Sequence, residues 1–152
     1  MFDIREDDLS GDQTRSLLAL HLAGMHAASP PGNVFALDLS GLQDPAVSVW
    51  TAWRDGRVAS IGAIKMLADG VAEVKSMRTH PDFTRRGAAD AILDTIIAFA
   101  RKRGVTRLSL ETGSGPAFEP AIALYRRRDF VSGAAFGGYQ ETEFNQFFHL
   151  AI

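Results

Sequence analysis

The sequence contains no cysteine, which excludes a disulfide framework, a thiolate nucleophile and any metal site built on thiolates. It also carries little net charge, because 16 Lys and Arg side chains stand against 18 Asp and Glu, giving a formal charge of −2. A chain without an overall basic field has no general attraction for nucleic acid, so no nucleic-acid partner is expected. The 4 histidines lack the spacing of a zinc-binding helix pair, and no metal site is expected.

Long hydrophobic runs are missing as well. No apolar stretch approaches the ~20 residues that a membrane span needs, and no charged and then apolar leader precedes the first expected helix. We therefore expect no membrane partner and a cytoplasmic location. With 152 residues, of which 46% are hydrophobic, the chain suits one core, and a single domain over residues 1–152 is predicted.

Hydrophobic periodicity predicts a mixed α/β fold. Two Asp-Gly pairs, at 55–56 and 69–70, separate three segments rich in β-branched and aromatic residues and predict antiparallel strands. An apolar stripe with helical spacing then begins near Ala88 and ends at Gly104, which predicts a parallel crossover into the next strand. In order, we expect a strand at 2–5, a helix at 14–27, strands at 47–53, 58–67 and 71–79, a helix from 88, a strand at 106–112, a helix ending near 128, and closing strands at 130–135 and 146–152.

The segment between the third of these antiparallel strands and the next helix predicts an anion site. Residues 80–87 form a short loop with two arginines and a glycine, and the helix opens immediately afterwards. Small side chains at Gly87, Ala88 and Ala89 let a ligand approach the backbone, while free N–H groups and the positive dipole end of the helix point at it. A pyrophosphate fits this description. The loop lacks the Gly-Lys-Ser/Thr ending of a P-loop and the three glycines of a dinucleotide fingerprint.

Two motifs make the chain similar to the GNAT N-acetyltransferases. Segment 74–93 resembles the acetyl-CoA loop of that family, in which a strand ending in His-Pro precedes Gln or Arg, two residues, Gly, one residue, and Gly or Ala. Segment 121–130 resembles the Ala-x-x-Leu-Tyr, three residues, Gly-Phe helix of the family, at the expected distance after the loop. Segments 75–79 and 108–113 further resemble a bacterial subgroup of small GNAT proteins.

Several positions depart from the family pattern. Thr84 stands where the family usually has Gln or Arg, and Arg85 stands where many members have Gly. Phe118 replaces an Asn that contacts CoA in many members, and Asp129 replaces a Gly, which is tolerable if the backbone there is left-handed. These departures keep open a non-catalytic acyl-CoA-binding or interaction module with the same fold, as the alternative to a working enzyme.

The resemblance implies an acyl-CoA N-acyltransferase fold, with a mostly antiparallel sheet and a β-α-β crossover that binds acetyl-CoA. It also implies direct transfer of an acetyl group from acetyl-CoA, as co-substrate, to a primary amine in a ternary complex. A small-molecule amine is the expected acceptor, although nothing in the sequence distinguishes a small amine, an amino acid, an antibiotic or a protein N-terminus. The residues expected to bind acetyl-CoA lie at the strand end, in the loop and in the first helical turn, and are Met77, Arg78, Thr79, Arg85, Arg86, Gly87, Ala88, Ala89 and Asp90.

Acyl transfer to an amine needs a base for the amine proton, a donor to the oxyanion and a partner for the leaving thiolate. By the resemblance, Glu73 is the expected base, the backbone N–H of Met77 the oxyanion donor, and Tyr125 the proton donor to sulfur. Glu73 can instead form an ion pair with Lys75 on the same strand face, which would leave Glu111 on the neighbouring strand as base. Without the family resemblance, Tyr125 would be interpreted as a core residue with its hydroxyl at the edge.

The acceptor cleft has weaker signals. In the family it is lined by the first helix, the loop after it and the chain end. Aromatic residues near the C-terminus can form an apolar acceptor pocket or a dimer interface, and a homodimer is therefore one expectation. The expected lining residues are Leu22, Met25, His26, Pro30, Pro31, Tyr139, Phe144 and Asn145, and the aromatic group is Phe136, Tyr139, Phe144, Phe147 and Phe148.

Overall fold

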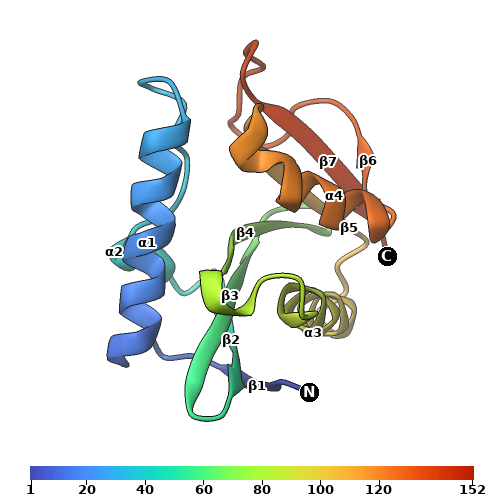
Figure 1. Cartoon of the computed structure of the whole chain (residues 1–152). Helices are drawn as coiled ribbons and strands as arrows, with labels where there is room; N and C mark the ends of the chain where they lie inside the picture. Colours follow the sequence, from blue (N-terminus) through green and yellow to red (C-terminus); the bar gives the residue numbers. More distant parts are fainter.

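The computed structural model describes all 152 residues of the chain, shown in Figure 1. Its elements are β1 (Asp3–Glu6), α1 (Asp12–Ala28), α2 (Leu39–Leu42), β2 (Val47–Arg54), β3 (Arg57–Met66), β4 (Val71–Thr79), α3 (Ala88–Lys102), β5 (Arg107–Thr112), α4 (Glu119–Arg127), β6 (Val131–Ser132) and β7 (Gln146–Ala151). Short 3-10 turns at Pro81–Phe83 and Pro116–Phe118 precede α3 and α4.

The strands form one 7-stranded sheet in the order β1-β2-β3-β4-β5-β7-β6. All neighbouring strands are antiparallel except β4 and β5, which run parallel and are joined by α3. Asp55 and Gly56 both have positive φ, the backbone that a two-residue hairpin between right-twisted strands requires. The predicted fold class, a mixed α/β sheet with antiparallel strands and then a β-α-β crossover, is confirmed.

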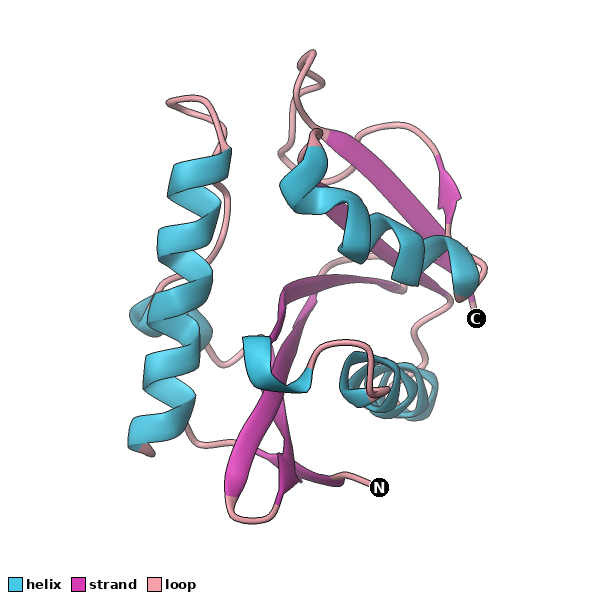
Figure 2. Ribbon diagram, viewed as in Figure 1, coloured by secondary structure: helices cyan, strands magenta, loops and turns pink.

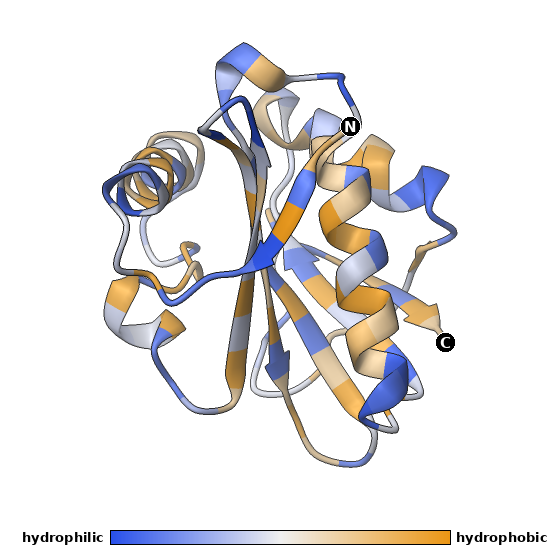
Figure 3. Cartoon of the chain, turned by 90° about the horizontal axis from the view of Figure 1, so that it is seen from below, coloured by the Kyte–Doolittle hydropathy of each residue, from blue (hydrophilic) through white to orange (hydrophobic).

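Helices cover both faces of the sheet. Figure 2 places α1 on one side of the strands and α3 and α4 on the other, and Figure 3 shows the same layers from below. The larger core lies under α3 and α4, where Ile92, Ile96 and Leu124 pack against the sheet. A smaller core lies under α1, where Leu17 and Leu18 pack with residues of β2 and β3. Burying an apolar stripe on each face makes this a three-layer domain.

Two short segments differ from the sequence-based expectation. The closing strand expected at 130–135 contains only Val131 and Ser132 in the sheet. Beyond them the Gly133 amide still donates to the Phe147 carbonyl at 3.0 Å, and the next carbonyl, that of Ala134, lies 2.8 Å from His149 Nε2. Helix α2 was not expected, and its first turn is held by the Asp38 carboxylate, which accepts from the Gly41 amide at 2.8 Å.

The parallel pair β4 and β5 opens after a few residues. Pairing covers only Val71 to Glu73 on β4, and the rest of that strand has no partner on its β5 side. On its other side β4 has a bulge, where Ser76 and Met77 together oppose Gly62, and Ser76 adopts φ 57°. The second half of β4 therefore has one unpaired edge in the middle of the sheet, next to the start of α3.

Candidate active site

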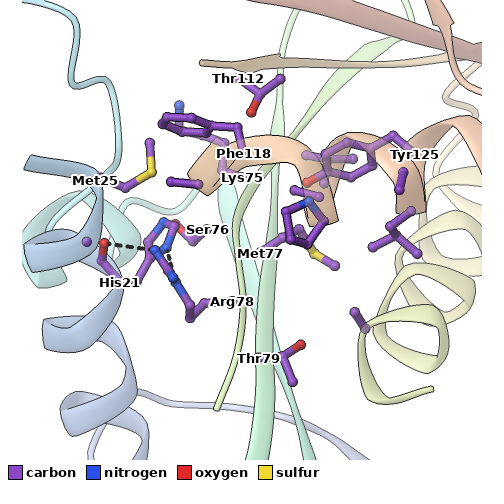
Figure 4. Close-up of a pocket in the computed structure, with 18 of the residues that line it drawn as sticks. His21, Met25, Lys75, Ser76, Met77, Arg78, Thr79, Thr112, Phe118 and Tyr125 are labelled. Atoms are coloured by element: carbon purple, nitrogen blue, oxygen red, sulfur yellow. Dashed lines mark hydrogen bonds between the residues drawn. The ribbon is translucent and has the colours of Figure 1, made fainter. Parts of the chain in front are cut away.

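A cavity of about 950 Å³ fills the opening between β4 and β5 and extends from α1 to the start of α3 and to α4. Figure 4 shows its walls, with His21 and Met25 on α1, Arg78 and Thr79 on β4, and Tyr125 on α4. The cavity brings together all the residues that the sequence assigned to acetyl-CoA or catalysis except Arg86. These lining residues are Glu73, Met77, Arg78, Thr79, Arg85, Gly87, Ala88, Ala89, Asp90, Glu111 and Tyr125.

The start of α3 has the properties of an anion site. Gly87 precedes the helix with φ 87°, and its carbonyl accepts the Ala91 amide at 3.0 Å, so the amides of residues 88–90 have no partner within the helix. A side chain on Gly87 would meet no atom within 4 Å, because the residue borders open space. Arg85, with φ 62°, and Gly87 are both left-handed, and the residues that carry these amides line the cavity. This backbone cradle fits a pyrophosphate.

The side chain of Asp90 has a separate structural contact. Its carboxylate accepts from Arg127 at 2.9 Å and from Arg128 at 3.4 Å, and Arg128 also pairs with Asp94. Helix α4 is thereby tied to the first turns of α3 across one end of the cavity. The predicted contact of Asp90 with acetyl-CoA therefore concerns its main chain and stays a prediction.

The bulge on β4 leaves a buried polar atom without a partner. The Ser76 hydroxyl is shielded from solvent and makes no hydrogen bond, although most buried polar groups are paired. Met77, the next residue, turns its side chain to α3, where a side chain on Gly62 would come within 2.5 Å of the Met77 sulfur. The bulge thus separates a methionine that packs in the core from main-chain groups at the cavity, which fit the expected thioester contacts.

Tyr125 lies on α4 with its ring buried against Phe130 at a centroid distance of 5.6 Å. Its hydroxyl has no hydrogen-bond partner in the protein, and the residue lines the cavity. Burial raises the pKa of Tyr125, so the hydroxyl is protonated and available as a donor at neutral pH. The ring is a core residue and the hydroxyl meets the cavity, so the two roles left open for this residue coexist.

Glu73 is the centre of a buried polar network. Its carboxylate accepts from Lys75 Nζ at 3.1 Å and from the Tyr139 hydroxyl, while Lys75 Nζ also donates to the Tyr139 oxygen at 2.8 Å. Lys75 reaches the Phe35 carbonyl at 3.3 Å as well. The ion pair of Glu73 with Lys75, one of the two alternatives at this position, is therefore present. Tyr139 was expected only in the acceptor cleft, and the sequence gives no sign of its bond to Glu73, because the two residues lie 66 positions apart.

Glu111 lies on β5 across the opening and has no hydrogen-bonding partner. Burial is the main cause that raises the pKa of its carboxyl to about 7, the positive charge of Lys75 lowers it, and the negative charge of Glu73 raises it. A carboxyl with a pKa near neutral exchanges protons readily at physiological pH. Glu111, which was expected on the strand next to Glu73, is thus a titratable group in the same cavity.

Arg78 points away from α3 and toward α1. Its Nε donates to His21 Nδ1 at 3.1 Å and its Nη2 to the His21 carbonyl at 3.4 Å, the contacts drawn in Figure 4. Burial and the charge of Arg78 lower the pKa of His21 to about 4, so the imidazole is neutral at physiological pH. Nothing in the sequence predicts a role for His21 at this site, since no local pattern links it to a residue 57 positions away.

The expected acceptor-cleft residues are mostly elsewhere. Of the set named above only Met25 lines the large cavity, and Phe144 and Pro30 border a separate, shallow cavity of about 520 Å³. The aromatic residues for which an acceptor pocket or a dimer interface was expected pack partly on one another: Phe136 lies 5.9 Å from Phe147 and 5.2 Å from Tyr139, between ring centroids. A homodimer and a cytoplasmic location stay predictions.

Two of the departures from the family pattern have a backbone explanation. Asp129 has φ 70° at the end of α4, so the left-handed conformation expected there is confirmed. Arg85 is likewise left-handed, which accounts for the glycine that many family members have at this position. Phe118 is buried, with its ring edge-on to Phe144 at 5.5 Å, and supplies packing where an Asn would supply an amide.

The structure has no group of three or more His, Asp or Glu side chains that could hold a metal ion. None of its helices is both long and apolar enough to cross a membrane.

Comparison with known proteins finds similarity to acetyltransferases. The model of the acetyltransferase (GNAT) family matches residues 14–130. The chain is 40% identical to the uncharacterised N-acetyltransferase YedL of Escherichia coli K12 over 100% of the chain and 96% of that protein. It is 44% identical to the uncharacterised N-acetyltransferase YsnE of Bacillus subtilis 168, over 91% of both chains.

Solved structures share the fold. A protein from Klebsiella pneumoniae that is assigned as an acyl-CoA N-acyltransferase superposes on this chain with a TM-score of 0.84 at 26% identity, over 99% of this chain and 97% of that one. An acetyltransferase of Bacillus subtilis, solved in complex with CoA, superposes with a TM-score of 0.74 at 15% identity, over 100% and 99% of the two chains.

Proposed function

Because the chain belongs to the acetyltransferase (GNAT) family, we propose that it transfers an acetyl group from acetyl-CoA directly to the primary amine of a small molecule. The observation that carries this proposal is the single cavity at the opened β4–β5 pair, which joins an anion cradle to a buried tyrosine hydroxyl and a titratable carboxyl. Its volume of about 950 Å³ is at the upper end of ligand pockets, enough for a cofactor and an acceptor together. The CoA complex of a protein with the same fold supports the choice of co-substrate.

The co-substrate supplies an activated acetyl thioester, and the residues present fit its parts. The amides of residues 88–90 and the dipole of α3 would bind the pyrophosphate, with Arg85 and Arg86 beside it. The unpaired edge of β4 at Met77, Arg78 and Thr79 would hold the pantetheine and direct a main-chain N–H at the thioester oxygen. The unpartnered Ser76 hydroxyl adds a polar group to the same wall.

Tyr125 would protonate the leaving thiolate. Its hydroxyl is free of other hydrogen bonds, and its raised pKa keeps it protonated at neutral pH, so it can donate a hydrogen bond to the negative charge that develops on sulfur and pass the proton along that bond. The packed ring fixes the position of the hydroxyl without a polar anchor.

We further infer that Glu111 removes the proton from the acceptor amine, with Glu73 as the alternative. Both carboxylates line the cavity, but that of Glu73 is engaged by Lys75 and Tyr139, whereas that of Glu111 is unpaired with a pKa of about 7. A base works best when its pKa lies near the operating pH. Glu73 was the first choice from the sequence, and that role stays a prediction.

The test is turnover of acetyl-CoA with a panel of small amines, followed as release of free CoA. We expect amine-dependent CoA release at least tenfold above the rate of thioester hydrolysis without amine, and an acetylated amine by mass spectrometry. A folded protein that binds CoA but acetylates no amine would favour the alternative, a non-catalytic acyl-CoA-binding module.

A further inference from the structure

We propose that the acceptor carries a carboxylate as well as its amine, and that the guanidinium of Arg78 binds this carboxylate on the α1 side of the cavity. This assignment rests on the proposed acetyl transfer and names the chemical class of its acceptor. It follows from the orientation of Arg78, from the lack of an anionic partner, and from the space left for the guanidinium.

The contacts of Arg78 leave one edge of the guanidinium free. Nε and Nη2 each donate one N–H to His21, and both of these hydrogens lie on the same side of the planar group. The remaining hydrogens include one on Nη1 and one on Nη2 that point away from the side chain in parallel. This end-on pair matches the two oxygens of a carboxylate, the geometry in which arginine binds anions most strongly.

No carboxylate of the protein neutralises Arg78. The acidic side chains of the cavity have other partners or positions: Glu73 pairs with Lys75, and Asp90 pairs with Arg127. Glu111 forms no ion pair or hydrogen bond with Arg78, and the causes that shift its pKa are burial and then the charges of Lys75 and Glu73. Burial lowers the pKa of Arg78, which records the cost of holding this cation without an anion. A ligand carboxylate would remove that cost, which makes an anion the favoured occupant.

His21 and Gly24 on α1 hold the guanidinium in place. His21 is neutral, so it accepts a hydrogen bond without adding a second positive charge. Gly24 leaves room for the group, because a Cβ at this position would come within 2.8 Å of Arg78 Nη2. A glycine inside a helix destabilises the helix relative to alanine. The close approach of Arg78 explains why Gly24 is present in α1 despite this cost.

The position of Arg78 separates this site from the phosphate site. The start of α3 lies on one face of the sheet, whereas Arg78 contacts α1 on the other face. The surroundings of the guanidinium are partly apolar, since Met25, Ala28 and Phe35 line the same cavity. An amine with a carboxylate and an apolar body, such as an apolar amino acid, fits these groups.

The test measures binding rather than turnover, so that it stands apart from the proposed activity. N-acetyl-L-methionine and N-acetyl-L-phenylalanine are titrated into the CoA-saturated protein by calorimetry, each beside its primary amide. The pairs differ only in the carboxylate and contain no amine whose protonation could interfere. We expect each acid to bind on the order of 10 to 100 times more tightly than its amide, the range for hydrogen bonds to a charged group.

Two variants locate the preference. Arg78→Met keeps the length of the side chain and should remove the preference for the acids, whereas Arg15→Met is a control outside the cavity, on the same helix as His21, and should keep it. Gly24→Ala keeps the charge but displaces the guanidinium, so the preference should fall while the unfolding midpoint is maintained or raised.

Equal affinity for acid and amide, failure of both acids to bind, or a preference that survives Arg78→Met would overturn the assignment. The proposed activity is judged separately, by CoA release with amines. Turnover of amines regardless of a carboxylate would refute the acceptor class and leave the acetyltransferase assignment standing. A carboxylate preference in binding without any turnover would leave the carboxylate site at Arg78 standing and refute the proposed acetyl transfer.

Discussion

The two ends of the cavity are built in different ways. The α3 end, residues 85–90, is made of main-chain amides in an exposed loop and the first turn of a helix, with a few small side chains that keep it open. The α1 end, comprising His21, Glu73, Lys75 and Arg78, is made of buried and half-buried side chains from segments distant in sequence, and Tyr139, outside the cavity lining, hydrogen-bonds to two of them. A group common to all reactions of a family can be bound by backbone, whereas a variable acceptor is selected by side chains.

The largest effect is expected between these two ends, at Tyr125. Tyr125→Phe removes one hydroxyl that has no partner in the protein and leaves the ring packed, so folding and CoA affinity should hardly change. Turnover should fall on the order of 10² to 10⁴, the range for one positioned acid. Single-turnover acetyl transfer, measured beside the unfolding midpoint, checks this prediction, and a wild-type rate would remove Tyr125 from the mechanism.

The next effect is expected at the two carboxylates. If Glu111 is the base, Glu111→Gln should lower turnover at neutral pH on the order of 10², and the wild-type rise of rate with pH around 7 should disappear. Glu73→Gln disturbs the pair with Lys75. It should change KM, while the inflection of the pH–rate profile near pH 7 should remain. The pH–rate profiles of both variants decide the matter, because loss of the inflection only in Glu73→Gln would assign the base to Glu73.

Glu111 should also affect stability, in a direction set by its raised pKa. The folded state favours the protonated carboxyl, so the wild type loses stability as pH rises from 4.5, the ordinary value, through about 7. Glu111→Gln has no charge to bury and should match wild type at pH 4 but exceed it at pH 8. Urea unfolding at the two pH values measures this, and equal pH dependence would show that the carboxyl is not strained by burial.

At the α3 end, Gly87→Asp places a negative charge at the backbone cradle and should weaken CoA binding at least tenfold, about 1.4 kcal/mol. Gly56→Asp is a matched control, because both glycines have positive φ and open space around the missing side chain. Calorimetry with CoA on both folded variants is the measurement. An affinity unchanged by Gly87→Asp would contradict the assignment of the loop.

The smallest effect is expected at Asp129, which has a left-handed backbone and no side-chain hydrogen bond. Asp129→Gly should relieve strain at the end of α4 but increase the freedom of the unfolded chain, for a net gain of about 0.5 kcal/mol. A rise in the urea midpoint with an unchanged slope would agree with this. A loss of stability would mean that the aspartate has a favourable role in capping α4.

Local signals made the α3 end predictable. Strand β4 has the bounds expected from its pattern, and α3 begins at the predicted Ala88, because the turn chemistry, the glycine and the apolar period all lie within one short segment. The family motif added the pairing of this loop with Tyr125 on α4, and both line one cavity. The identities of Glu73 and Glu111 as neighbours followed from adjacent parallel strands.

The α1 end could not be predicted in the same way. The contacts of His21 with Arg78, and of Tyr139 with Glu73, join residues 57 and 66 positions apart, and no periodicity in the chain encodes such pairs. The sequence left open an acceptor pocket or a dimer interface for the C-terminal aromatic residues, and it did not indicate that Phe136, Tyr139 and Phe147 pack on one another. Packing of large apolar side chains is favourable wherever they meet, so composition alone cannot distinguish a core from a pocket.

The sequence by itself determined the order of the strands and of the three long helices, the left-handed glycine before α3 and the presence of the family motifs, since each depends on residues close together in the chain. Only the tertiary structure decided how the charges are distributed in the cavity: Glu73 paired, Glu111 unpaired with a raised pKa, and Arg78 without an anion. The physical reason is that burial and Coulomb interactions depend on distance in space, and the fold alone sets those distances.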